Sequence, residues 1–135
     1  MAVVELEVPF PQQELPPQVE DFLEAAEERV EEFLRNVRVR QASFVPSDFR
    51  AVYDALRVIA DQSLAPGHVF CEWGSGVGVV ACLAAMLEFE ASGIEIQDHL
   101  VEASRELAED FELDVEFIAG SFVPACLLYT SPSPR

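Results

Sequence analysis

Apolar and polar positions follow the period of a strand in some segments and the period of a helix in others. In the second half of the chain, strand and helix patterns alternate. Short apolar runs at 69–72, 89–96 and 115–118 predict three strands. Residues 77–87 and 98–111 carry helical patterns; the first is apolar nearly all round, and the second has a largely acidic outer face. Strands that alternate with helices at this spacing predict right-handed crossovers and a parallel sheet, hence an α/β fold.

Two further helices are expected upstream. Residues 19–34 place apolar side chains at three- and four-residue steps opposite Glu and Asp, which predicts an acidic accessory helix over one side of the core. A lid or partner-docking helix is the alternative. Residues 49–59 form a second apolar stripe, with Ser47 as the expected N-cap and Asp48 in the first turn. Residues 3–8 alternate apolar and acidic positions and suggest a short strand.

Three segments are expected on this basis. Residues 1–40 form an N-terminal extension with the acidic helix, and residues 41–125 form the strand–helix unit. Residues 126–135 read Cys-Leu-Leu-Tyr-Thr-Ser-Pro-Ser-Pro-Arg and look like the translation of a transposase adapter used in sequencing libraries. Because Ser-Pro-Ser-Pro cannot donate a strand ladder, we expect this tail to be non-native and the sheet to be truncated after its third strand.

Composition narrows the function classes. The 135 residues allow one small domain, and half of them are hydrophobic, which suffices for a core. The net charge is −17 and lysine is absent, which argues against a broad nucleic-acid-binding face. No apolar run is long enough to span a membrane, and no secretion signal is recognised at the N-terminus.

The cysteines and histidines show no metal or redox spacing, so we expect no metal site and a cytoplasmic location. Cys71 and Cys82 sit in apolar runs, which predicts that both are small buried hydrophobic residues.

The candidate chemistry lies in the turn after the first strand. Gly74, Gly76 and Gly78 let the backbone come close to a ligand, and the helix start behind them offers N–H groups. A dinucleotide site would need its third glycine at position 79, which is Val79. Glu72 would repel a pyrophosphate and would suit a ligand with an ammonium group. An NAD-linked oxidoreductase is therefore a disfavoured alternative.

This acidic-x-Gly-x-Gly-x-Gly pattern resembles motif I of the class I S-adenosylmethionine-dependent methyltransferases, which have a seven-stranded Rossmann-like sheet. Glu95 ends the second strand, 21 residues after Gly74, where the family places the acid that binds the ribose. Gly120 and Ser121 stand where the family carries a Gly-Asp pair near the adenine amino group, with Ser121 in place of the commoner Asp. The resemblance covers roughly residues 44–124.

The resemblance implies the roles of the site residues. The glycine turn would hold the methionine part of the cofactor with Glu72 near its amino group, Glu95 would bind the ribose, and residues 44–46 would close over the methionine end. Ile96 and Phe122 would sandwich the adenine. The expected cofactor-binding residues are Glu72, Gly74, Ser75, Gly76, Gly78, Glu95, Ile96, Ser121 and Phe122.

The resemblance also implies the activity. The cofactor would be S-adenosyl-L-methionine, and a methyl group would pass by in-line displacement to an unidentified acceptor, a small molecule or a protein. The family orders its strands 3-2-1-4-5-7-6, so this chain would hold strands 3, 2 and 1 and be inactive alone, with catalytic residues unassigned. A non-catalytic cofactor-binding or regulatory fragment is the alternative. The oligomeric state is left open.

Overall fold

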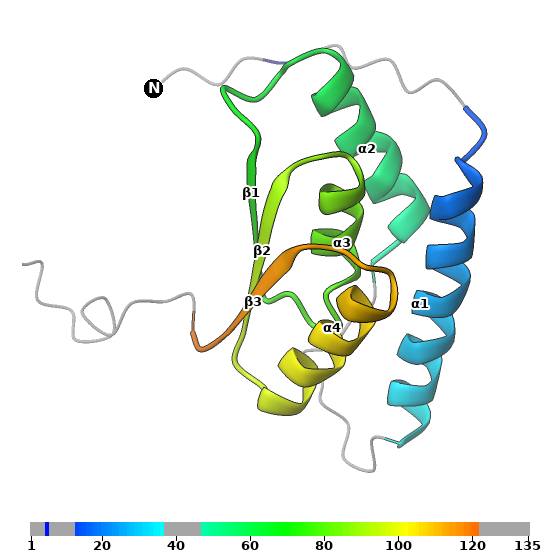
Figure 1. Cartoon of the computed structure of the whole chain (residues 1–135), viewed down its shortest axis with the longest axis vertical. Helices are drawn as coiled ribbons and strands as arrows, with labels where there is room; N and C mark the ends of the chain where they lie inside the picture. The colour runs from blue at the N-terminus through cyan, green and yellow to red at the C-terminus, as the bar shows by residue number, and fades with distance from the viewer. Residues whose placement is uncertain (1–4, 6–12, 37–46, 122–135) are drawn as a thin grey trace, which may run out of the picture.

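The computed structural model describes residue 5, residues 13–36 and residues 47–121. Two helices precede an alternation of strands and helices in these ranges (Figure 1). The elements are α1 (Pro17–Asn36), α2 (Phe49–Asp61), β1 (Val69–Trp73), α3 (Val79–Met86), β2 (Glu90–Glu95), α4 (Asp98–Asp110) and β3 (Val115–Ala119). No helix among the described residues is both long and apolar enough to cross a membrane.

The sheet is parallel, with β2 between β1 and β3. Glu72 of β1 pairs with Gly93 of β2, and Gly93 pairs in turn with Phe117 of β3. The predicted α/β fold, with a parallel sheet that ends at the third strand and an N-terminal acidic helix, is therefore confirmed. The predicted start of the central helix at residue 77 is wrong: α3 begins at Val79, because the turn continues through Gly78.

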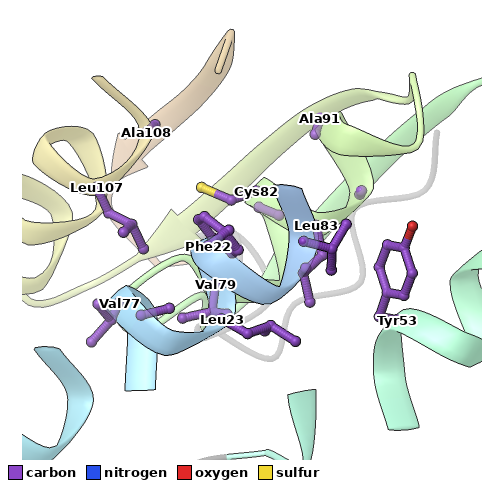
Figure 2. Close-up of a cluster of buried hydrophobic side chains, with 14 of the residues drawn as sticks. Phe22, Leu23, Tyr53, Val77, Val79, Cys82, Leu83, Ala91, Leu107 and Ala108 are labelled. Atoms are coloured by element: carbon purple, nitrogen blue, oxygen red, sulfur yellow. The ribbon is translucent and has the colours of Figure 1, made fainter. Parts of the chain in front are cut away.

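All four helices lie on one face of the sheet (Figure 1). Side chains from α1, α2, α3 and α4 meet there in one hydrophobic cluster, part of which Figure 2 shows. Phe22 of α1 is fully buried and packs edge-on against Phe111 at the end of α4, with ring centroids 5.2 Å apart. Burial of one such side chain contributes roughly 1.5–3 kcal/mol, so α1 is part of the main core.

Helix α1 is tied to α4 along its length. Arg29 forms an ion pair with Asp110, and the Phe33 ring stacks on His99 with centroids 5.6 Å apart. The predicted accessory helix over the core is confirmed. The proposed boundary at residue 40, the strand at 3–8, residues 44–46 and the tail at 126–135 lie outside the described residues and stay predictions.

The other face of the sheet is uncovered within the described ranges. Side chains alternate along a strand, so Val69, Cys71 and Trp73 of β1 all point away from the helices. Val69 is 75% exposed and Trp73 is 68% exposed. Cys82 is buried as predicted, but the predicted burial of Cys71 is wrong, because its strand is covered on only one face.

The predicted cap of α2 is also displaced by one residue. Asp48, not Ser47, is the N-cap, and its side chain accepts a hydrogen bond from the Ala51 amide at 3.1 Å. The acid therefore satisfies one of the unpaired amides of the first turn, as a cap does, instead of only favouring the helix dipole.

We expect Gly78→Ala to destabilise the protein by about 2–5 kcal/mol. Gly78 has φ +80°, and a Cβ there would lie 2.6 Å from the Phe117 ring and 2.8 Å from Ser104 Cβ. Urea unfolding followed by circular dichroism measures the change. Gly67→Ala is the matched control, because nothing lies within 4 Å of a Cβ there. Equal unfolding midpoints for the two variants would contradict this account of the packing.

Candidate functional site

The glycine turn lies at the carboxyl edge of the sheet. Most of its backbone amides donate hydrogen bonds to acceptors within the protein. The amides of Gly74 and Ser75 donate to the Ile94 carbonyl at 2.8 and 3.0 Å. The Gly76 amide donates to Glu95 Oε1 at 3.0 Å, and the Gly78 amide donates to the Ser75 carbonyl at 2.8 Å. The four amides are therefore already hydrogen-bonded before any ligand arrives.

Two residues of neighbouring elements hold this turn in place. Gly93 of β2 allows close approach, because a Cβ there would lie 2.8 Å from both Cβ and Oγ of Ser75. Ser104 of α4 is fully buried, and its hydroxyl lies 2.9 Å from the Gly76 carbonyl and 2.8 Å from the Leu100 carbonyl, both acceptors. Ser104 is not among the site residues predicted from the sequence; the available signal was a polar residue on the inner stripe of a predicted helix.

Glu95 joins the turn to the start of α4. It is 8% exposed; Oε1 accepts from the Gly76 amide, and Oε2 accepts from the Gln97 amide at 2.9 Å. A carboxylate oxygen carries two lone pairs, so each oxygen can still accept one more hydrogen bond. Glu95 is thus held rigidly with acceptor capacity to spare, as a group that binds hydroxyls requires.

Glu72 caps the helix behind the turn. Its Oε2 accepts from the Ala81 amide at 3.1 Å, in the first turn of α3, where the N-cap residue Gly78 has no side chain to offer. Burial raises the pKa of Glu72 to about 7; the Ala81 hydrogen bond opposes this rise, and the nearby Glu95 charge adds to it. The charge of Glu72 therefore changes near neutral pH.

These groups line one cleft of about 310 Å³, a volume at the lower end of the range for small-molecule sites. The predicted site residues that line it are Glu72, Gly74, Ser75, Gly76, Glu95, Ile96 and Ser121. Gly78 is not among the lining residues, because it packs behind the turn against Phe117. Phe122 lies outside the described residues.

Other lining residues went unnoticed in the sequence. Val30 of α1, Phe49 of α2 and Leu100 of α4 bring apolar surface to the cleft. Gln97, the N-cap of α4, also lines it. Nothing in the sequence singled out Gln97, because a polar residue between a strand and a helix is typical of any loop.

Two polar atoms in this cleft are buried without a hydrogen-bond partner among the described residues: Ser75 Oγ and Gln97 Oε1. A buried polar group without a partner is unfavourable, and each such group in a folded protein calls for an explanation. Both residues line the cleft in which a ligand with polar groups would bind.

The chemistry of the cleft favours hydroxyl and ammonium groups over phosphate. Two carboxylates line it, and the amides of Gly74, Ser75, Gly76 and Gly78 donate to acceptors within the protein. The described ranges hold no group of three His, Cys, Asp or Glu residues that could bind a metal ion. Cys82, whose pKa burial raises to about 12 with a contribution from the Glu72 charge, stays protonated and is unsuited to act as a nucleophile.

We expect Glu72→Gln to stabilise the protein at alkaline pH. The pKa of Glu72 rises from 4.5 to about 7 on folding, so the native state binds more protons between these values and loses stability as pH increases through them. At pH 8 the variant should exceed the wild type by up to about 3 kcal/mol, and at pH 4 the two should be alike. Urea unfolding across this range measures it, with the exposed Glu90→Gln as control. A constant difference at all pH values would contradict the shift.

Comparison with known proteins finds no matching family model and no matching curated protein. Among solved structures, the chain is similar to the tRNA (uracil-54, C5)-methyltransferase of Pyrococcus abyssi in complex with S-adenosyl-L-homocysteine. The identity is 24% over 58% of this chain and 20% of that chain, with a TM-score of 0.47.

Two further methyltransferases are similar to the chain. One, from Geobacter sulfurreducens, is 21% identical over 82% of this chain and 53% of its own, with a TM-score of 0.48. The other, CcbJ from Streptomyces caelestis, is 26% identical over 64% of this chain and 35% of its own, with a TM-score of 0.45. The chain thus spans between 20% and 53% of these three proteins.

Proposed function

We propose that this chain is the cofactor-binding part of an S-adenosylmethionine-dependent methyltransferase that transfers a methyl group to an unidentified acceptor. One observation carries the proposal: Glu72 and Glu95 line a cleft in which the amides of the glycine turn are already engaged. Such a cleft offers carboxylates, which repel a pyrophosphate and attract a cationic ligand with hydroxyl groups.

The residues present fit S-adenosylmethionine. Glu72 in its ionised form would attract the ammonium group, and the unused lone pairs of Glu95 would accept from the ribose hydroxyls. Ile96 is 70% exposed at the end of β2, where it offers an apolar surface to the adenine. Ser75 Oγ, which has no partner among the described residues, is available to a polar group of the same ligand.

When bound, S-adenosylmethionine supplies an electrophilic methyl group on a sulfonium centre. The contribution of this chain is to orient it and to exclude water. Glu95 is held by two backbone amides, so it needs no rearrangement to receive the ribose. The apolar walls from α1, α2 and α4 keep water from the cleft. No residue of the chain is assigned to the acceptor.

The acceptor is a small molecule or a protein in this proposal, in a cytoplasmic setting. The net charge of −17 and the absence of lysine oppose the phosphate contacts on which nucleic-acid binding depends. The similar Pyrococcus abyssi protein is named for a tRNA substrate. Retention of this chain by a tRNA at low salt would favour a nucleic-acid acceptor instead.

Isothermal titration of the chain with S-adenosyl-L-homocysteine and with NADH tests the cofactor class. We expect a saturable isotherm with S-adenosyl-L-homocysteine and none with NADH, because the carboxylates of Glu72 and Glu95 line the cleft and would repel the pyrophosphate of NADH. Binding of NADH alone would contradict the methyltransferase proposal and would favour an oxidoreductase.

We expect Glu95→Ala to weaken S-adenosyl-L-homocysteine binding by about 10- to 100-fold, the effect of losing hydrogen bonds to a charged group. Glu90→Ala is the matched control, since Glu90 is an exposed acid at the opposite end of β2 and does not line the cleft. Titration calorimetry gives both affinities, and circular dichroism confirms that each variant is folded. Unchanged affinity in folded Glu95→Ala would remove Glu95 from the site.

A further inference from the structure

The side chain of Gln97 neither caps its helix nor has a partner for its buried oxygen among the described residues. Gln97 is the N-cap of α4, yet its side chain makes no capping hydrogen bond. Its Oε1 atom is buried and finds no hydrogen-bond partner among the described residues. Glutamine is not one of the residue types that helix caps favour, so capping does not account for it.

Gln97 lines the same cleft as Glu95. The Gln97 backbone amide donates to Glu95 Oε2, so the residue is anchored directly to the acid that we assign to the ribose. Ile96 and Leu100, which line the cleft on either side of it in sequence, are apolar, and Ser121 lines the same cleft after β3. A polar side chain among apolar lining residues, joined through its backbone amide to the proposed ribose acid, is suited to the polar edge of a base.

From this arrangement we infer that Gln97 is a specificity-determining residue, whose side-chain oxygen accepts a hydrogen bond from the 6-amino group of the adenine. The inference rests on the proposed function. It gives a donor to a side-chain oxygen that is buried without a partner among the described residues, and a buried hydrogen bond is stronger than one exposed to water. Ser121 offers only a hydroxyl at the end of β3, so the Gln97 amide supplies the stronger acceptor for an amino group.

A cycle of two ligands and two proteins tests the inference. The ligands are S-adenosyl-L-homocysteine and its analogue with hydrogen in place of the 6-amino group, each titrated calorimetrically into the full chain. The wild type should bind the analogue about three- to tenfold more weakly, the effect of one hydrogen bond. Gln97→Met, which keeps length but removes the amide, should bind both ligands alike.

Two controls separate recognition from structure. Gln18→Leu, at an exposed position of α1 outside the cleft, should retain the wild-type preference. Without ligand, Gln97→Met should be at least as stable to urea as the wild type, since it removes a buried acceptor without a partner. Gln97→Ala repeats the affinity test in a smaller side chain should Gln97→Met fail to fold.

The outcomes are distinguishable. Loss of the preference in Gln97→Met, with the preference intact in Gln18→Leu, supports the role of Gln97. A wild type that binds both ligands equally, or a Gln97→Met variant that keeps the preference, overturns this role and leaves the methyltransferase proposal in place. Failure of the wild type to bind S-adenosyl-L-homocysteine overturns both.

Discussion

The Glu95 carboxylate is the interaction on which the rest of the site depends. It accepts one amide from the glycine turn and one from the start of α4, so a single side chain joins the ends of β1, β2 and α4. The Ile94 carbonyl next to it accepts two more amides of the turn. These contacts form within the protein and need no ligand, so they preorganise the cleft.

This arrangement requires small residues beneath the turn. Gly93 lets Ser75 approach β2, and Gly78 lets α3 start directly over the Phe117 ring. Ser104 then fixes the turn from the side of α4 through the Gly76 carbonyl. Gly93, Gly78 and Ser104 therefore fix both the packing of the strands and the position of the turn, which couples the stability of the fold to the shape of the cleft.

The acids of the cleft also set its electrostatics. Burial makes ionisation of Glu72 unfavourable, and the adjacent Glu95 charge adds to the cost. A cationic ligand would relieve both effects, whereas an anionic one would add to them. The same charge that lowers stability of the empty protein at high pH thus favours the ligand class that we propose.

The sequence by itself determined the elements and the two principal acids. Hydrophobic periodicity is a local property, so the strands and helices could be predicted to within a few residues, and the positions of Glu72 and Glu95 at strand ends follow from that pattern. The tertiary structure decided which atoms meet.

Only the fold shows that Glu72 caps α3, that Ser104 holds Gly76, that Gln97 Oε1 lacks a partner among the described residues, and that Cys71 faces away from the helices. These contacts join residues from different elements or depend on which face of the sheet is covered. A one-dimensional pattern does not record them, because it specifies the face of each element and not the neighbour that the face meets.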